Sequence, residues 1–561
     1  MTKTDGAELV FLPLGGCGEI GMNLNAYGFG PPDERRWILI DVGVTFGGVD
    51  TPGIDIITPD PAFLEDQGDR IDAIFLTHAH EDHIGAIGLL YPRLNTRAPI
   101  YATAFTAHLA ATKLMERGVA NVDINIVSLG GKVDAGPFSV RYVTLTHSIP
   151  EPNALAITTE FGTILHTGDW KIDPDPQLGA ETDVEGLKKL GDEGVLAMIC
   201  DSTNVFVDGE SGSEGTVRQS LVELIAGLGG RVAVTTFASN VARVSTVIEA
   251  ARQAGRSVCL LGRSMHRITE AAVTTGVIGR LPDLVDEEAA GSFPDDKILF
   301  LCTGSQGESR AALGRIARGD HRHVSLGDGD TVIFSSRVIP GNEREIFAMQ
   351  NDLAEKGVRI ITDRMTSSPI HVSGHPARDE LRQMYQWVRP KISVPVHGER
   401  RHIVEHAAFA KSLQVSEAVT PRNGDVVRLA PGAAKVVDGV PAGRLYLDGD
   451  RLVPAESEGI RERRAIGYNG YVSIGVAIDE EGDLVDGPMV VSRGLSEPDG
   501  RSADESLIEI DEAAEDALQS LKRRKRLDDR EVERALVRAV RKASLRSFGR
   551  KPVIDVSVLR V

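Results

Sequence analysis

The residues best suited to chemistry lie in the stretch THAHEDHIG (residues 77–85), which has the pattern His-x-His-x-Asp-His. His78 and His80 follow the apolar run AIFL, and on an extended chain they point the same way because side chains alternate. Asp82 and His83 begin the next helix, whose apolar face comes from IGAIGLL. Neutral imidazoles and a carboxylate suit zinc, or manganese where oxygen ligands dominate. The motif therefore predicts two adjacent metal ions at one strand end.

A dinuclear site needs more ligands than these, and three later strand ends offer them. His147 in TLTHSIP, Asp169 in HTGDWK and His397 in VPVHGE each follow an apolar run. Taken alone, such a His is more often a satisfied polar group, and Asp in TGDW a turn residue. Their recurrence at strand ends after the first motif favours metal binding. Asp41 in LIDVG also ends a strand, and we expect its carboxylate to orient the ligand loop, with a turn cap as the alternative.

Composition bounds the class of protein. The chain has 561 residues and a net charge of -19, so two or three domains are expected, and bulk charge does not attract nucleic acid. At 42% hydrophobic and 25% charged residues it reads as a soluble globular protein. Its 4 cysteines form no CxxC pair, which argues against disulfides and thiolate zinc. Without a secretory signal or an 18-residue apolar run, we expect a cytoplasmic protein that does not span a membrane.

The pattern of predicted strands and helices that position these residues changes along the chain. Short β-rich apolar runs fill residues 8–170 and predict mixed sheets with outer helices. Between 210 and 375, strands alternate with helical or Gly-rich sequence, which is typical of a parallel α/β domain. After Arg378 a helix and a strand return, and segment 447–464 is charged and poor in apolar periodicity. We interpret that segment as a linker and the fold class as α/β.

The tail has a charge of its own. Residues 515–561 hold 14 Lys and Arg against 7 Asp and Glu, although the whole chain is acidic. Two alternating runs, YVSIGVAI and PVIDVSVLRV, flank two helical patterns, the second with Val532, Leu536 and Val540 on one face. These features predict a small αβ domain. Because the apolar face and edges of so small a sheet need covering, we expect it to drive self-association into a homodimer or homotetramer.

The strand-end ligands resemble those of the metallo-β-lactamase superfamily, an αββα sandwich with a dimetal site at one edge. The interval from Asp169 to His397 is far longer than that fold needs, so an inserted domain is expected. The chain is similar to the β-CASP family of nucleic-acid-processing enzymes, whose further motifs match Asp201 in CDSTN, His375 in HVSGHP and His397 in VPVHGE. The resemblance is narrowed to the bacterial ribonuclease J family by the C-terminal tail and by four further motifs, GGCGEIGMN, TFASN, TGSQGE and SSRVIPGNE.

This resemblance implies the domain boundaries. DNA-repair members carry Val where this chain has His397, and transfer-RNA 3′ processing enzymes or glyoxalase-like hydrolases lack the insert, so RNA processing is favoured. The expected parts are 1–209, the first part of the metallo-β-lactamase domain; 210–378, the inserted β-CASP domain; 379–446, the second part of the metallo-β-lactamase domain; 447–464, the linker; and 465–561, the C-terminal αβ domain.

The resemblance also implies roles around two zinc ions, with manganese possible. It implies that His375 stabilises the phosphorane or protonates the leaving oxygen, with a surface His as the alternative. It implies that Asp201 orients neighbouring histidines, with a helix-capping Asp as the alternative. Asp82 and Asp41 complete the expected catalytic group. One metal takes His78, His80 and His147, the other takes Asp82, His83 and His397, and Asp169 bridges them.

Other matched motifs are expected to bind single-stranded RNA. Ser239 and Asn240, with Ser373, Gly374 and His375, resemble a pocket for a terminal 5′-phosphate, built from hydroxyls and backbone N–H groups.

Two further parts of the chain are expected to contact RNA. Phe46 follows Asp41 closely enough to stack on a base, although a core Phe is a serious alternative. The basic helices at Lys522 to Arg526 and at Arg534, Arg538 and Arg541 are expected to attract RNA, with a solvated charged face as the alternative.

The expected activity is metal-dependent hydrolysis of RNA from the 5′ end, with a preference for 5′-monophosphate and additional internal cutting, in RNA decay and rRNA or mRNA maturation. Partners from RNA degradation or the ribosome are expected. A β-CASP endonuclease without exonuclease activity is one alternative, and an inactive RNA-binding scaffold subunit is another. All seven ligand positions are filled, which disfavours the scaffold.

Overall fold

The structure is a computed structural model that describes residues 6–48, 50–339, 341–496 and 503–561. The chain forms two compact units, of which the first comprises Met1–Thr45 and Thr58–Gly443 and the second Phe46–Ile57 and Arg444–Val561. Over the described part of the chain, no helix has both the length and the apolar character needed to cross a bilayer.

The first unit contains two large sheets that face each other. One has the strand order β24-β23-β1-β3-β4-β7-β8-β9 and the other β10-β11-β12-β13-β14-β20-β22. The strands of the first sheet are β1 (Glu8–Gly15), β3 (Leu24–Gly30), β4 (Arg36–Ile40), β7 (Ile71–Phe75), β8 (Ile100–Ala102), β9 (Ile124–Ile126), β23 (Asp425–Ala430) and β24 (Lys435–Gly439). Those of the second are β10 (Lys132–Ala135), β11 (Phe138–Thr144), β12 (Asn153–Thr159), β13 (Gly162–His166), β14 (Val195–Asp201), β20 (Ile392–Val396) and β22 (Glu417–Ala418).

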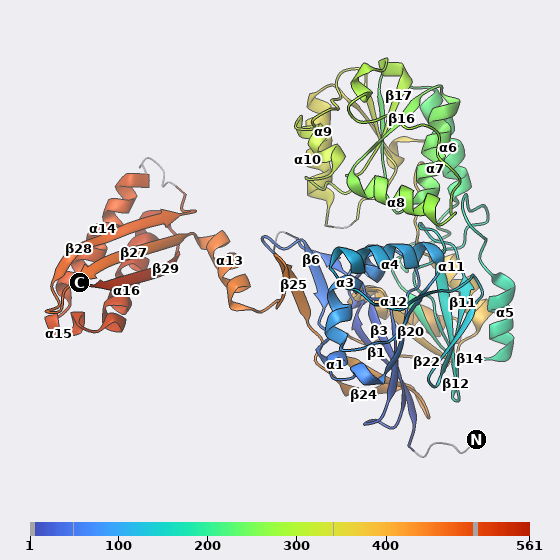
Figure 1. Ribbon diagram of the computed structural model, residues 1–561, viewed down its shortest axis with the longest axis horizontal. Helices are drawn as coiled ribbons and strands as arrows, with labels where there is room; N and C mark the ends of the chain where they lie inside the picture. The colour runs from blue at the N-terminus through green and yellow to red at the C-terminus, as the bar shows by residue number, and fades with distance from the viewer. Residues whose placement is uncertain (1–5, 49, 340, 497–502) are drawn as a thin grey trace. The chain divides into compact units, whose positions relative to one another are not determined.

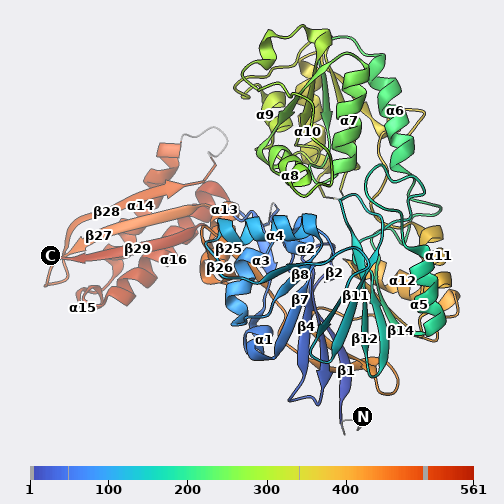
Figure 2. The ribbon, with the colours of Figure 1, turned by 45° about the vertical axis from the view of Figure 1, so that its right-hand side comes forward.

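The core of this sandwich lies between the sheets. Phe11, Tyr27 and Phe75 of the first sheet share one buried apolar cluster with Phe138 and Tyr142 of the second. Figure 2 shows helices on the outer side of each sheet, which gives the expected αββα order. The helices are α1 (Ala62–Glu65), α2 (Glu81–Ile84), α3 (Ile87–Leu90) and α4 (Ala104–Glu116) on the first, and α5 (Val184–Glu193), α11 (Arg378–Val388) and α12 (Arg400–Ser412) on the second. Two short strands, β2 (Cys17–Gly18) and β21 (Gly398–Glu399), pair beside the sandwich.

The inserted domain is a parallel α/β domain, as the sequence predicts. All pairs in its sheet, in the order β16-β17-β15-β18-β19, are parallel. Helices cover both faces (Figure 1), which explains why its strands are continuous apolar runs. The elements are α6 (Glu214–Ala226), β15 (Val232–Thr235), α7 (Val241–Gln253), β16 (Ser257–Leu261), α8 (Arg263–Thr274), β17 (Ile298–Cys302), α9 (Ala312–Arg318), β18 (Thr331–Phe334), α10 (Glu343–Glu355) and β19 (Arg359–Thr362).

The second unit joins a four-stranded sheet to the C-terminal domain. Residues 447–464, predicted to be a linker, have regular structure: they form the end of β25, then β26 and half of α13. The four-stranded sheet has the order β26-β25-β6-β5. Its strands and the helix that follows them are β5 (Thr45–Phe46), β6 (Ile56–Pro59), β25 (Arg444–Asp448), β26 (Arg451–Pro454) and α13 (Glu458–Asn469).

The C-terminal domain has a three-stranded sheet with helices on one face, which confirms the predicted αβ domain. Alternate residues of β27 are buried, and Val532, Leu536 and Val540 of α16 pack against them. Its elements are β27 (Tyr471–Ile478), β28 (Leu484–Arg493), α14 (Ala503–Ser520), α15 (Arg523–Arg526), α16 (Asp529–Phe548) and β29 (Val553–Arg560).

Candidate metal centre

Strand direction gathers the predicted ligands at one edge of the sandwich. β4 and β7 are parallel in the first sheet, and β13, β14 and β20 are parallel in the second. Because parallel strands end at the same edge, the residues that follow them come together. These residues are Asp41 after β4, His78 and His80 after β7, His147 after β11, Asp169 after β13, Asp201 at the end of β14 and His397 after β20.

Three imidazoles form the first ligand group. Nδ1 of His80 lies 3.2 Å from Nε2 of His78 and 3.1 Å from Nε2 of His147. Ligand nitrogens around a tetrahedral zinc ion are about 3.3 Å apart, so the spacing fits such an ion. Burial is the main cause that lowers the pKa of all three, that of His80 to about 4. The imidazoles are therefore neutral at physiological pH, as metal ligands must be.

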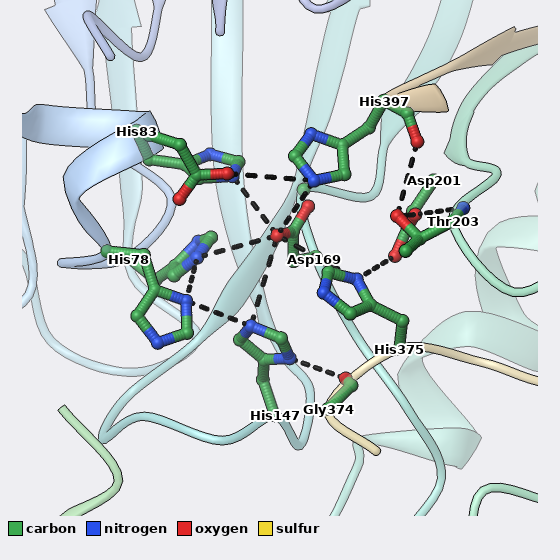
Figure 3. A network of polar contacts seen from close by, with 12 residues as sticks. His78, His83, His147, Asp169, Asp201, Thr203, Gly374, His375 and His397 are labelled. Carbon is green, nitrogen blue, oxygen red and sulfur yellow. Dashed lines mark hydrogen bonds and ion pairs between the residues drawn. The ribbon is translucent and has the colours of Figure 1, made fainter. Parts of the chain in front are cut away.

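Asp169 joins this group to a second one. Its Oδ2 lies 3.9 Å from Nε2 of both His78 and His147, 3.2 Å from Nε2 of His83 and 3.4 Å from Nε2 of His397. Figure 3 shows this carboxylate in the middle of the ring of histidines. A single oxygen shared by both groups is the arrangement that a bridging ligand requires.

The second group contains Asp82, His83, Asp169 and His397, whose ligand atoms lie within 4.8 Å of one another. Oδ2 of Asp82 is 3.6 Å from Nε2 of both His83 and His397. Oδ1 of Asp169 and Nε2 of His397 are buried and have no hydrogen-bond partner among the described residues. Nε2 of His397 faces this cluster, and a cation there would satisfy it, because a buried polar atom without a partner is costly.

Hydrogen bonds from Asp41 position two parts of the predicted ligand set. Oδ1 of Asp41 accepts a hydrogen bond from the Thr77 N–H at 2.8 Å. Its Oδ2 accepts from the Thr77 hydroxyl at 2.8 Å and from Nδ1 of His83 at 2.7 Å. Asp41 thus holds the loop before His78 and leaves Nε2 of His83 facing the metal site. Asp41 (φ 63°) and His397 (φ 52°) both occupy the left-handed region, a cost that functional positions often carry.

Asn23 is a functional candidate that the sequence reasoning did not identify, although it lies in the quoted stretch GGCGEIGMN. Its Nδ2 donates to the carbonyl of Asp82 at 3.0 Å, and its Oδ1 lies 3.1 Å from Nδ1 of His397. The side-chain amide of Asn23 therefore positions two predicted ligands, Asp82 and His397, that lie far apart in the sequence.

His375 and Asp201 form a pair beside the cluster. Nδ1 of His375 lies 2.8 Å from Oδ2 of the fully buried Asp201, whose Oδ1 accepts from the backbone N–H and hydroxyl of Thr203. Burial alone would lower the pKa of His375, but Asp201 and Asp169 outweigh it and raise that pKa to about 9. Asp201 therefore favours the protonated form of the His375 ring, which lies 24% exposed at the edge of the site.

The residues of the predicted phosphate pocket have further partners. Ser373 Oγ accepts hydrogen bonds from Nδ2 of Asn204 at 2.8 Å and from the N–H of His375 at 3.2 Å. The Gly374 carbonyl accepts from Nδ1 of His147 at 2.5 Å, so Gly374 helps to position a predicted metal ligand. A Cβ at Gly374 would lie 2.8 Å from the His147 ring, which explains the glycine.

The other half of the predicted pocket lies at the start of α7. Asn240 caps this helix, with its Oδ1 accepting from the N–H of Arg243 at 2.9 Å, and its Nδ2 donates to Glu214. Among the described contacts, none joins Ser239 or Asn240 directly to Ser373 or Gly374. Arg243 donates to the carbonyl of Ile370, so the helix start lies beside the segment that leads to Ser373.

Phe46 lies in β5 of the second unit, with 63% of its surface exposed. It is therefore not a core residue, and stacking on a base stays a prediction.

Known proteins match this chain over nearly all of its length. Ribonuclease J of Sinorhizobium meliloti is 48% identical over 557 residues, which cover 99% of this chain and 98% of that protein. The chain belongs to the ribonuclease J family. Ribonuclease J of Corynebacterium glutamicum is 37% identical over 97% of this chain and 75% of its own length. Ribonuclease J 1 of Streptococcus pyogenes is 35% identical over 98% of both chains.

Family models match the ribonuclease J parts in chain order. They are the beta-lactamase superfamily domain (36–184), the Ribonuclease J beta-CASP domain (229–353), the Zn-dependent metallo-hydrolase RNA specificity domain (364–421) and the Ribonuclease J C-terminal domain (458–561). A solved protein of unknown function from Enterococcus faecalis shares the fold over 75% of this chain, with a TM-score of 0.50 at 15% identity. The chain is thus a metallo-hydrolase with nuclease activity, and the expected fold class is confirmed.

Proposed function

We propose that this ribonuclease J family member hydrolyses single-stranded RNA from the 5′ end, with additional internal cutting, using two zinc ions per chain. The observation that carries the proposal is the Asp169 carboxylate, whose Oδ2 faces two complete groups of imidazoles and carboxylates. Manganese is the alternative ion. Complete ligand sets also favour an active enzyme over an RNA-binding scaffold.

The proposed reaction breaks the P–O3′ bond and adds water, leaving a 5′-phosphate and a 3′-hydroxyl. Bound zinc ions lower the pKa of water and offset negative charge on the phosphoryl oxygens. His375 donates its proton toward the leaving O3′ or a phosphoryl oxygen. Asp201 keeps the ring oriented and charged through Nδ1. Asp41, Asn23 and Gly374 hold the ligands in place.

We expect the preference for a 5′-monophosphate to depend on Ser239 and Ser373. Changing both to Ala removes two hydroxyl donors to a charged group, which costs about 10- to 100-fold in 5′-end exonucleolysis. Cutting of a circular RNA should fall less than cutting from the 5′ end, because it uses no end. The measurement compares initial rates on 5′-monophosphorylated, 5′-triphosphorylated and circular RNA.

Ser220→Ala with Ser412→Ala is the matched control, since these hydroxyls donate to carbonyls of their own helices. Equal loss of end-dependent and internal cleavage would reject the pocket. Cleavage of circular RNA with none from a 5′-monophosphate end in the unchanged protein would favour the endonuclease alternative.

We propose that the C-terminal domain drives assembly into a homodimer or homotetramer. Met489 and Val491 of β28 and Leu559 of β29 lie on the sheet face opposite the helices, and their side chains are 68%, 40% and 63% exposed. Apolar side chains on such an open face favour a subunit contact.

Removal of residues 458–561 should therefore give a smaller species in light scattering, with residual hydrolysis of short RNA. Met489→Asp with Leu559→Asp should have the same effect on mass in a full-length chain. An unchanged mass in both proteins would reject the assembly role.

A cytoplasmic role in RNA decay and maturation, with partners from RNA degradation or the ribosome, accords with this activity.

A further inference from the structure

The exposed side of α16 forms an open groove with a volume of about 490 Å³. Its seven lining positions on α16 recur every three or four residues and so lie on one helical face, which is about 18 Å long. The groove belongs to the C-terminal domain and contains none of the metal-site residues. Its lining residues are Glu533, Arg534, Val537, Arg538, Arg541, Lys542, Leu545 and Lys551.

Positive charge dominates the groove, because five of these side chains are basic and one is acidic. Arg534 lies 3.4 Å from Glu531, one turn away. In the described part of the chain, Arg538, Arg541, Lys542 and Lys551 have no ion pair. Uncompensated cations in a chain of net charge -19 mark this groove as a place for an anionic ligand.

The length and lining of the groove favour a polymer over a small anion. Cations spread along three turns of helix match a chain of repeated phosphates. Val537 and Leu545 add apolar contact, and no aromatic ring lines the groove. Binding through phosphates and aliphatic side chains carries no base-specific contact, so the groove would accept any sequence. The same face of a second copy is excluded because like charges repel.

We propose that this α16 groove binds the phosphate backbone of substrate RNA as a second site, separate from the metal centre. The proposal rests on the proposed function in that its ligand is the RNA being cleaved. Each phosphate contact releases counterions from the RNA, so the site contributes to the salt dependence of binding.

The test removes three groove charges from the full-length chain, by Arg538→Ala, Arg541→Ala and Lys551→Ala. Binding to a long single-stranded RNA is measured with EDTA present to stop cleavage. Since each contact with a single strand contributes about 0.7 to the slope of log K against log salt, the slope should fall by about 2. Affinity at low salt should fall at least about tenfold.

Two matched variants show whether the effect belongs to the groove. Arg538→Lys with Arg541→Lys keeps the charge and should keep the slope. Removing three surface charges that are paired on their own helices, by Lys188→Ala, Lys189→Ala and Arg252→Ala, should change the slope less. Hydrolysis of a short 5′-monophosphorylated RNA reports on the proposed function separately and should stay unchanged in the groove variant.

An unchanged slope in the groove variant would overturn the proposal, as would an equal fall of the slope in the control variant with three paired charges removed. A changed molecular mass with unchanged RNA binding would also overturn it, and would assign the groove to an acidic protein surface such as α14 of a second copy.

Discussion

Replacing His80 by Ala or Asp82 by Asn is expected to abolish RNA cleavage while the protein stays folded. His80 lies between two other imidazoles, and Asp82 faces His83 and His397, so each change removes a ligand from one metal. Metal ions contribute several kcal/mol to transition-state stabilisation, which corresponds to a loss of at least about 10³-fold in kcat/KM. The large apolar core between the sheets contains no ligand, so circular dichroism should be unchanged.

Neighbouring residues provide the controls. Glu81→Gln changes the carboxylate beside Asp82, which pairs with Lys113 at 2.7 Å instead of entering the cluster. His108→Ala changes a histidine on α4, outside the cluster. Both should cleave RNA within a few-fold of the unchanged protein. Full activity in His80→Ala or Asp82→Asn would show that the cluster is not the catalytic metal centre.

Replacing His375 by Ala is expected to lower kcat by about 10²- to 10⁴-fold, with little change in KM or metal content. The reason is that His375 lies at the edge of the site with its Nδ1 2.8 Å from Oδ2 of Asp201, a carboxylate that favours the protonated imidazole. Asp201→Asn keeps the shape of the partner but removes its charge, so it should cost less, about 10- to 100-fold. The measurement is single-turnover cleavage of a short 5′-monophosphorylated RNA.

The control for this prediction is His321→Ala, a histidine of the inserted domain outside the metal groups. Loss of metal from His375→Ala, in proportion to its loss of activity, would contradict the proposed role in proton donation. It would instead assign His375 to holding the ligand cluster.

The sequence predicted which side chains would come together, because the end of a strand can be read from local sequence. Each ligand follows an apolar run, and parallel strands must end at a common edge, so His78, Asp169 and His397 were expected together. The sequence did not identify Asn23, because its role depends on a contact with His397, which is 374 residues away. The spacing of apolar residues along the chain cannot predict such a long-range contact, although Asn23 lies in a stretch that resembles the family.

Long-range pairing also explains the segment predicted as a linker. Residues 447–464 have little apolar periodicity of their own, but β25 and β26 join β5 and β6 from residues 45–59. A strand that takes its partners from a distant part of the chain needs no strong local pattern.

Asn240 has a structural role that its position before a helix indicates, in addition to the predicted contact with a 5′-phosphate. An Asn directly before a helix is a common N-cap, and the side chain of Asn240 caps α7. We therefore expect the proposed phosphate pocket to depend on Ser239 and Ser373 more than on this amide.

We propose that the histidine and aspartate cluster holds two metal ions that enable RNA hydrolysis. The most direct test removes all metal from the full-length protein, adds zinc or manganese back in steps, and measures bound metal and RNA cleavage on the same samples. We expect no cleavage without metal and full recovery of cleavage at two ions per chain. Asp82→Asn should neither bind two ions nor recover cleavage. Full cleavage by a protein whose metal content is near zero would contradict the proposal.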